Sequence, residues 1–562
     1  MPAGRCDQGA CTSPHSRSSP TSEESEMHGM QIIGAETSAC GKQTFTAHNP
    51  VTGEPLPTCF HEATQAEIHQ AALLADEAFD PFRAKAPNGI AAFLFAIADQ
   101  LQELEQVLIE RAHIETGLTV QRLTEEVLRA IHQARLYAQV VREGSWQMPR
   151  IDIGLPEAAP QGRPDLRTTL FPLGPVAVFG ASSFPISMSV AGTDTISALA
   201  AACPVIVKAH PLHPGTSEIL GTAISEAARQ TAMPSGVFSL IHSTQPEVVR
   251  HLVQHPIIRA VAFTGTYQGG RALMEAASNR EDPIPVFAEM GSLNPVFVLP
   301  EILQERAPKI AEGFVQSITR ACGQLCTRPG IMVAFGGKGF DQLIEVVTEH
   351  ALKAPSQVML SESIFEACRE GTDRIARTPG VLSLTPLTTG NPAEEPPARH
   401  RCLTNTCSLF QANAKTFLAQ AHLQEDVFGP VAILIRCDTE EELLALARNL
   451  SGQLAATVFG THSDLREFPG VVRELKKRVG RLVYNGFPTD ITLGHAIHHG
   501  GPYPAAMFPH FSSIGTTAIY RFVRPLCLQD CPEEQLPQEL QDSNPRGLWR
   551  IVDGSLSRQP LL

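Results

Sequence analysis

Apolar and polar positions alternate along this chain with two different periods, and the changes of period divide it into predicted elements. Between about residues 64 and 141, apolar residues recur at three- and four-residue spacing, which predicts helices with a break at Pro87-Asn88-Gly89. We interpret the recurring apolar positions as core contacts; they include Phe93, Leu94, Ile97, Leu101, Leu104 and Leu108. Ahead of this region, residues 46–55 predict a strand and a turn.

From Gly174 onward, short apolar runs alternate with helical segments. The predicted strands are 176–179, 205–208, 237–241, 260–263 and 286–289, and the predicted helices are 188–202, 217–228, 248–254 and 272–277. This alternation predicts parallel strands with crossover helices, an open doubly wound α/β sheet. Ligands bind such sheets beyond the carboxyl ends of the strands. Gly180, Lys208, Gly265 and Glu289 all stand at those ends.

Three further stretches of the chain lie outside residues 174–289. A second alternating region runs from residue 294 to about 460, and the piece after about residue 517 is rich in Pro, Gln and Arg. The first 30 residues are rich in Ser, Pro, Gly and Glu and predict a disordered tail. We recognise no internal repeat in the sequence.

Length and charge narrow the class of protein. A chain of 562 residues predicts more than one domain, and its 43% hydrophobic and 18% charged residues are ordinary for a globular protein. The balance of 44 basic against 58 acidic residues gives −14. That charge argues against nucleic acid or an anionic membrane as a partner. Because no run of about 18 apolar residues occurs, we expect no membrane-spanning helix.

The cysteines and histidines give no metal or disulfide pattern. The 13 cysteines are odd in number and irregularly spaced, which predicts free thiols in a reducing cytoplasm. His495, His498 and His499 are close in sequence but precede the turn-rich run Gly500-Gly501-Pro502-Tyr503-Pro504. We therefore predict no metal site there.

A nucleotide site is indicated at the strand ends. Gly265-Thr266-Tyr267-Gln268-Gly269-Gly270 follows a strand and opens a helix, where glycine lets an anion approach unpaired amides. A plain connector has the same pattern. Lys208 and His210 together favour a 2′-phosphate, hence NADP over NAD, and Pro211 leaves no acidic side chain there to repel it. A solvated strand end is the alternative for Lys208.

Two residues are candidates for covalent chemistry. Cys326 lies in Gly323-Gln324-Leu325-Cys326, before a tight break in the chain, where a thiolate nucleophile is surrounded by backbone amides. Cys322, four residues earlier and one helical turn away, is interpreted as a core residue, with oxidative pairing to Cys326 as the alternative. Glu289 at a strand end is a candidate base for activating water. Together they predict thiol attack on an aldehyde, hydride loss to a nicotinamide, and thioester hydrolysis.

These motifs resemble the aldehyde dehydrogenase superfamily from about Met30 onward. The motifs, in the family's order, are Phe179-Gly180-Ala181-Ser182-Ser183-Phe184-Pro185, Val207-Lys208, Phe263-Thr264-Gly265, Glu289-Met290-Gly291, Gly323-Gln324-Leu325-Cys326 and Phe428-Gly429-Pro430. Within the superfamily, the chain most resembles the 2,5-dioxovalerate (α-ketoglutaric semialdehyde) dehydrogenases. The subgroup features are Val207-Lys208-Ala209-His210-Pro211, Pro285 to Ser292, His499 to Pro504, and Asn544 to Arg550.

The resemblance implies a fold and a domain plan. The fold is a Rossmann-like cofactor domain (31–150 and 168–291) with an α/β catalytic domain (292–516). A small oligomerisation extension (151–167 and 517–562) implies dimers or tetramers. The implied activity is NAD(P)-dependent oxidation of 2,5-dioxopentanoate to 2-oxoglutarate.

It also implies residue functions. Cys326 is the implied nucleophile and Glu289 the general base. Lys208 and Thr266 hold the adenosine side, Gly265 passes the pyrophosphate, and Phe428 packs near the nicotinamide ribose. The remaining implied cofactor residues are His210, Phe263, Gly270 and Asp426.

Two departures from the family pattern fall at the chemistry. Ser183 stands where the family has an oxyanion-binding Asn, and the loss of one such donor typically costs about 10²–10³ in rate. Asp426 stands where the family has a Glu that binds the nicotinamide ribose. Two alternatives therefore stay open: a dehydrogenase for another small aldehyde, and a nucleotide-binding homologue with little turnover. Arg142, Arg163 and Arg167 are positional candidates for the distal carboxylate.

Overall fold

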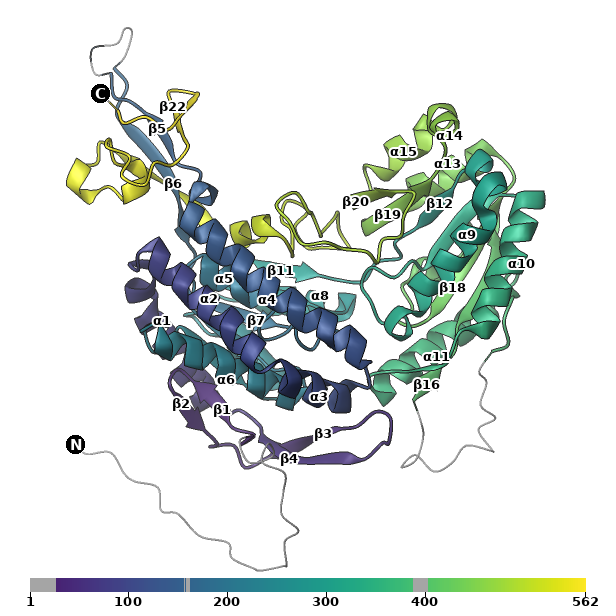
Figure 1. Cartoon of the computed structure of the whole chain (residues 1–562), viewed down its shortest axis with the longest axis horizontal. Coiled ribbons are helices and arrows are strands. Elements are labelled where there is room, and N and C mark those ends of the chain that lie inside the picture. Colours follow the sequence, from purple (N-terminus) through teal and green to yellow (C-terminus); the bar gives the residue numbers. More distant parts are fainter. Residues whose placement is uncertain (1–26, 156, 158–161, 388–402, 562) are drawn as a thin grey trace, which may run out of the picture.

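The computed structural model describes residues 27–155, 157, 162–387 and 403–561. Most of the tail predicted to be disordered lies outside these residues. The backbone N–H groups of His28 and Gly29, at the end of that segment, donate to the buried carboxylate of Glu218 (2.7 and 2.9 Å). Figure 1 shows two large α/β bodies side by side, with a thin extension projecting from one of them.

The first body is built on a sheet in the order β11-β10-β7-β8-β9-β1-β2. Its five parallel strands are β7 (Val176–Phe179), β8 (Val205–Lys208), β9 (Phe238–Ile241), β10 (Ala260–Thr264) and β11 (Val286–Glu289). They confirm the five predicted strands to within one residue. The antiparallel strands β1 (Gln31–Ile33) and β2 (Glu36–Ser38) complete one edge.

The order of these strands creates a binding crevice. The chain runs from β7 outward to β8 and β9, then returns to β10 and β11 on the other side of β7. The order therefore reverses between β7 and β10. In open α/β sheets, ligands bind at such a reversal, beyond the carboxyl ends of the strands.

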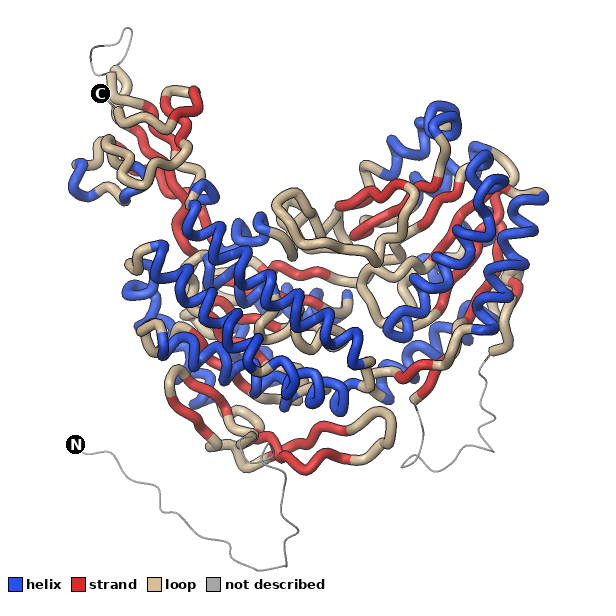
Figure 2. The backbone as a smooth tube through the Cα atoms, in the orientation of Figure 1, coloured by secondary structure: helices blue, strands red, loops and turns tan. Residues whose placement is uncertain are grey.

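Helices cover both faces of this sheet (Figures 1 and 2). Alternate strand residues point to opposite faces: Val178 and Val207 join one hydrophobic cluster with helices α2 to α6, while Ala177 and Ile206 join another with α1, α7 and α8. The helices are α1 (Gln65–Arg83), α2 (Pro87–Glu103), α3 (Glu105–Thr116), α4 (Val120–Glu143), α5 (Thr193–Ala200), α6 (Pro214–Gln230), α7 (Pro246–Gln254) and α8 (Tyr267–Ser278).

Two helix predictions need correction. The helical region 64–141 has further interruptions at Leu104 and at Gly117, whose left-handed φ of 65° ends α3. The helix predicted from residue 188 begins only at Thr193, because residues 188–192 form turns. An added Cβ on Gly192 would lie 2.7 Å from the Met188 backbone, so only glycine permits the close approach within this turn.

The second body carries a sheet in the order β15-β17-β18-β13-β12-β19-β20. Its parallel strands are β12 (Val296–Val298), β13 (Ile331–Phe335), β17 (Ser408–Asn413), β18 (Val431–Cys437), β19 (Gln453–Phe459) and β20 (Val479–Tyr484); β15 (Leu382–Ser383) is antiparallel. Helices α9 (Pro300–Thr319) and α10 (Lys338–Lys353) pack on one face. The opposite face is covered by α11 (Glu362–Ala376), α12 (Ala414–Ala419), α13 (Glu440–Asn449) and α15 (Pro469–Leu475).

The extension is a third sheet, in the order β21-β6-β5-β22-β23. It joins β5 (Arg150–Asp152) and β6 (Leu166–Pro172) to β21 (Val523–Gln529), β22 (Arg550–Val552) and β23 (Ser555–Ser557), which come from the end of the chain. A separate hairpin of β3 (Thr44–His48) and β4 (Pro55–His61) lies at the bottom of Figure 1. None of the described helices is both long and apolar enough to cross a membrane.

The loop 485–515 connects the second body back to the first. Its backbone pairs with the end of β11: Met290 N–H donates to the Ala505 carbonyl (2.8 Å), and Met507 N–H donates to the Ala288 carbonyl (3.0 Å). The loop therefore crosses the space between the two sheets and brings its own side chains beside Glu289.

Candidate active site

A cleft between the two bodies collects most of the predicted site residues. Its walls come from the turn after β7, the ends of β10 and β11, helix α4, the segment around Cys326, and the loop 485–515. The predicted residues that line it are Ser183, Gly265, Thr266, Glu289, Cys326, Asp426 and Phe428. The structure thus brings together side chains that lie far apart in the sequence.

The chain around Cys326 is held in an irregular conformation. Ala321 and Cys322 have left-handed φ angles of 53° and 55°, which corrects the expectation that Cys322 lies one helical turn from Cys326. Cys322 is buried, and its thiol contacts the Gln357 carbonyl (3.4 Å), as expected for a core residue. The buried Asn294 amide donates to the carbonyls of Cys326 (2.8 Å) and Arg328 (2.9 Å) and fixes the segment that carries the nucleophile.

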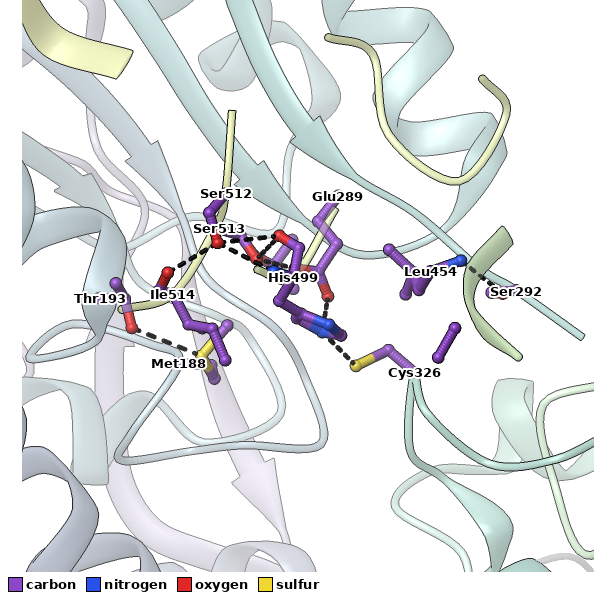
Figure 3. Close-up of polar contacts among 12 residues, drawn as sticks. Met188, Thr193, Glu289, Ser292, Cys326, Leu454, His499, Ser512, Ser513 and Ile514 are labelled. Atoms are coloured by element: carbon purple, nitrogen blue, oxygen red, sulfur yellow. Dashed lines mark hydrogen bonds and ion pairs between the residues drawn. The ribbon is translucent and has the colours of Figure 1, made fainter. Parts of the chain in front are cut away.

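The thiol of Cys326 faces an imidazole and a carboxylate. His499 Nε2 lies 3.6 Å from Cys326 Sγ and 3.0 Å from Glu289 Oε1, and Figure 3 shows the ring between the two. The hydroxyl of Ser513 donates to Glu289 Oε2 and to the His499 carbonyl (3.1 Å). The backbone N–H of His499 donates to Ser512 Oγ (2.9 Å). Sequence analysis missed His499 as part of this site.

Electrostatics set the resting state of this group. Burial acts to raise the pKa of Glu289, but contact with His499 and hydrogen bonds from Ser513 and Cys326 outweigh it and lower that pKa below its usual value. Burial and then the charge of Glu289 raise the pKa of Cys326 well above its usual value. The sulfur therefore rests as a thiol, and a neighbouring base must accept its proton when it attacks.

Ser183 occupies the turn between β7 and α5. It is 4% exposed and lines the cleft, as the resemblance implies for an oxyanion donor. Buried Glu126 of α4 holds the turn by accepting hydrogen bonds from Ile186 N–H (3.2 Å) and Ser187 N–H (3.1 Å). That the Ser183 hydroxyl donates to the oxyanion stays a prediction.

Asp426 is held by a buried arginine that is only two residues from the nucleophile. The guanidinium of Arg328 is 2% exposed, forms an ion pair with Asp426 and donates to the Val427 carbonyl (3.1 Å). Burial raises the pKa of Asp426, against the opposing charge of Arg328. Since the shorter Asp side chain is fixed from behind, its carboxylate is positioned at the cleft wall.

The turn into α8 is the predicted place for a pyrophosphate. Thr266 caps α8 and accepts a hydrogen bond from Gly269 N–H (3.1 Å). A Cβ on Gly265 would lie 2.5 Å from the Phe263 ring, and one on Gly270 would lie 2.7 Å from the Met290 sulfur. Glycine is therefore required at both positions because Phe263 and Met290 pack against them, and binding of a pyrophosphate at this helix start stays a prediction.

Lys208 and His210 lie deeper, at the end of β8, and do not line the cleft. Burial lowers the pKa of Lys208 to about 8, with the charge of Glu62 opposing it. His210 is not on a continued strand: its ring stacks on His213 at 5.1 Å, and burial holds its pKa well below the usual value. A neutral His210 can donate a hydrogen bond but brings no positive charge.

The arginines of the cleft are not the three named from sequence. Arg163 pairs with Asp553 (2.6 Å) and Arg167 with Asp542 (2.7 Å), both in the extension, while Arg142 is exposed at the end of α4. The cleft is lined instead by Arg122, Arg129, Arg320 and Arg374, of which Arg374 pairs with Glu425 (2.7 Å). Arg122 and Arg129 lie seven residues apart on α4 and therefore on one face of that helix. This spacing is the sequence feature that could have predicted them.

Arg129 differs from its neighbours because no ion pair neutralises it within the described part of the chain. Arg122 pairs with Glu126 (3.1 Å), and Arg320 pairs with Glu125 (3.0 Å). Arg129 donates to the Ile491 carbonyl (2.8 Å). Burial and the charge of Arg122 lower the pKa of Arg129, but a guanidinium stays charged, and Arg129 lines the same cleft as Cys326.

Comparisons with known proteins agree with this geometry. The aldehyde dehydrogenase family model matches residues 37–363. The chain is 44% identical to "Alpha-ketoglutaric semialdehyde dehydrogenase 2" of Azospirillum brasilense over 94% of this chain and 99% of that protein. It is 39% identical to "Alpha-ketoglutaric semialdehyde dehydrogenase" of Acinetobacter baylyi over 95% and 100%.

Solved structures confirm the expected α/β aldehyde-dehydrogenase-like fold. Betaine aldehyde dehydrogenase of Staphylococcus aureus matches with a TM-score of 0.76 at 18% identity, covering 92% of this chain and 97% of that one. A 1-pyrroline-5-carboxylate dehydrogenase matches with a TM-score of 0.74 at 20% identity, covering 89% and 92%. With its nucleophile segment, strand-end carboxylate and glycine turn in these positions, the chain belongs to the aldehyde dehydrogenase family.

Proposed function

We propose that this NAD(P)-dependent aldehyde dehydrogenase oxidises 2,5-dioxopentanoate (α-ketoglutaric semialdehyde) to 2-oxoglutarate. The observation that carries the proposal is Arg129, a charge without an ion-pair partner in the described chain, in the same cleft as Cys326 and Glu289. A dicarbonyl substrate with one distal carboxylate matches that arrangement. The two relatives named for this semialdehyde cover nearly the whole chain and support the same substrate.

The first half of the mechanism uses the thiol and the imidazole. Cys326 Sγ bonds to the aldehyde carbon as its proton passes to His499 Nε2, which lies 3.6 Å away. Ser183 and backbone N–H groups at the cleft wall are the proposed donors to the developing oxyanion. When bound at the turn that Gly265 and Thr266 form, NAD(P) would supply a hydride acceptor, and loss of hydride from the thiohemiacetal carbon would leave a thioester on Cys326.

The second half uses the carboxylate. Glu289 is ionised because its surroundings lower its pKa, so it can take a proton from water. The hydroxyl oxygen bonds to the thioester carbon, the carbon–sulfur bond breaks, and the sulfur recovers a proton. The product leaves as a carboxylate. Ser513 keeps Glu289 oriented by donating to its second oxygen.

The test of this function is a comparison of substrates. We expect kcat/KM for 2,5-dioxopentanoate to exceed that for butanal, which has the same reactive group and no carboxylate, by about 10²-fold, measured as NADPH or NADH formation. Equal values would instead favour a dehydrogenase for simple aliphatic aldehydes. Slow turnover of every aldehyde despite bound cofactor would favour the weakened nucleotide-binding homologue.

Arg129→Met tests the arrangement behind this preference. Loss of a charge-assisted contact to the distal carboxylate is expected to lower kcat/KM for 2,5-dioxopentanoate by about 10²-fold and to leave butanal nearly unchanged. Arg135→Met is the matched control, because Arg135 lies on the same helix but pairs with Asp99 (3.3 Å) at the surface. An equal loss with both aldehydes would show that Arg129 only supports the fold.

Cofactor preference gives a prediction about pH. Lys208 in the free enzyme has a pKa of about 8, and a ribose or 2′-phosphate contact favours its charged form. NADP⁺ affinity should therefore be full below about pH 8 and fall by up to about tenfold per pH unit above it. Lys208→Met should flatten the Kd–pH profile measured by calorimetry, whereas the exposed Lys353→Met should not. An unchanged profile in Lys208→Met would remove Lys208 from the site.

The proposal extends to assembly and compartment. Strands β21 and β23 form the free edges of the extension, and Trp549 and Leu556 are 47% and 66% exposed beside them. These features support self-association as a dimer or tetramer through the extension, which light scattering on an extension-deleted chain would test.

All ten cysteines in the described residues are free thiols, which supports a reducing cytoplasm as the site of action.

A further inference from the structure

The three reactive side chains of the cleft also form a set of metal ligands. A thiol, an imidazole nitrogen and a carboxylate oxygen, from Cys326, His499 and Glu289, all lie within 4.8 Å of one another. Soft and borderline cations such as Zn²⁺ bind sulfur, nitrogen and oxygen ligands together. The sequence did not indicate this set of ligands, because His499 stands beside His495 and His498 in sequence and far from Cys326 and Glu289.

Two of the three distances between the ligand atoms fit a tetrahedral ion, and the third, from Cys326 Sγ to the carboxylate oxygen, is within 4.8 Å. Zn²⁺ takes sulfur at about 2.3 Å and imidazole nitrogen at about 2.0–2.1 Å, which places the two ligand atoms about 3.5 Å apart, and nitrogen and oxygen ligands about 3.3 Å apart. The observed separations are 3.6 Å from Cys326 Sγ to His499 Nε2 and 3.0 Å from His499 Nε2 to Glu289 Oε1. An ion therefore needs shifts of only a few tenths of an ångström between these pairs.

Unused polar atoms point to a ligand. Glu289 Oε1 is buried and lies 3.0 Å from His499 Nε2, and the buried His499 Nδ1 has no hydrogen-bond partner within the described chain. Both side chains are only 3% exposed. Buried polar atoms without partners are costly, and an ion at this point would use the Glu289 oxygen and the His499 Nε2 lone pair.

We propose that a divalent cation of the zinc type binds reversibly to Cys326, His499 and Glu289 and blocks the enzyme. This inference concerns the site of the proposed function and rests on the same nucleophile. The ion displaces one proton from the Cys326 thiol to solvent and forms bonds to sulfur, Nε2 and Oε1. A water from the cleft fills the fourth position. The thiolate and the carboxylate together neutralise the two charges of the ion. Binding involves no oxidation or reduction.

The surroundings make this site weaker than a structural zinc site. A ligating histidine normally donates its other N–H to a carboxylate or carbonyl, and His499 Nδ1 has no such acceptor among the described residues. Only Glu289 is oriented from behind, by Ser513. The cation is therefore expected to exchange and to be removed by a chelator.

Cobalt(II) provides a test that needs no turnover. Titration of the full-length, metal-free enzyme with Co²⁺ is expected to produce a thiolate-to-cobalt charge-transfer band that saturates at one ion per protomer and disappears on addition of Zn²⁺. Cys326→Ala should abolish the band, although Cys40, Cys59 and Cys527 remain exposed elsewhere. A band that survives in Cys326→Ala, or none in the native enzyme, would overturn the proposal.

Adjacent histidines supply the matched control. His499→Gln should weaken Co²⁺ binding by at least about tenfold, whereas His498→Gln should bind it as the native enzyme does. Equal binding by both variants contradicts the inference. Zn²⁺ should also slow alkylation of Cys326 by iodoacetamide, with full recovery after EDTA. Aldehyde oxidation is assayed separately in EDTA, so failure of the metal site and failure of the proposed function give different results.

Discussion

Cys326→Ala will lower kcat for aldehyde oxidation by on the order of 10⁴-fold or more, while Cys322→Ala will keep native turnover. Loss of a covalent nucleophile removes the whole pathway through the thioester. Cys322 is the rival only four residues away, but its thiol is buried against the Gln357 carbonyl and does not line the cleft. NADPH formation is the measurement, at a temperature where melting curves show both variants folded.

Mass spectrometry adds a direct check of the nucleophile. Enzyme quenched during turnover should carry the acyl group on Cys326 alone. An acyl group on Cys322, or turnover retained in Cys326→Ala, would contradict the assignment. Cys322→Ala is allowed a modest loss of stability, because it removes a buried sulfur from a packed core.

Glu289→Gln will separate the two halves of the reaction. Without a carboxylate to activate water, hydrolysis of the thioester slows, and steady-state kcat should fall by about 10²–10⁴-fold. Hydride transfer remains, so rapid mixing should show a burst of about one NADPH per active site before the slow phase. The amide keeps the size of the side chain and can still accept a hydrogen bond from Ser513.

The control and the contrary outcome are both defined by neighbouring groups. Glu218→Gln alters another mostly buried carboxylate, which binds the His28 and Gly29 amides far from the cleft, and should show ordinary kinetics. If Glu289→Gln gives no burst while His499→Gln does, the imidazole activates water and the carboxylate serves the thiol. The 3.0 Å contact between the two groups makes this exchange the specific alternative to exclude.

The strand ends could be predicted from sequence because each is a local pattern. The runs that became β7, β8, β10 and β11 are short, apolar and mostly buried, and each stops at a glycine or a charged residue. Parallel strands then bring Lys208, Gly265 and Glu289 to one edge by topology alone. Helix ends fared worse, as at residues 188–192, where a tight turn precedes α5.

His499 could not be predicted because its partners are distant. It lies 173 residues from Cys326 in sequence, on a loop whose path is set by backbone pairing with β11. Before that pairing is known, the run after it indicates only turns. The arginines of the cleft could not be predicted for a related reason. Arg163 and Arg167 follow the helical region in sequence, but they belong to the extension and pair there with Asp553 and Asp542.

The loop 485–515 has a consequence for how the enzyme comes into being during synthesis. Glu289 and Cys326 leave the ribosome long before His499, and the loop can reach them only after the second sheet has formed up to β20. A nascent chain that has completed its first sheet and its nucleophile segment therefore still lacks the imidazole that takes the thiol proton. The thiol, the carboxylate and the imidazole therefore come together only when this loop docks on β11, late in synthesis.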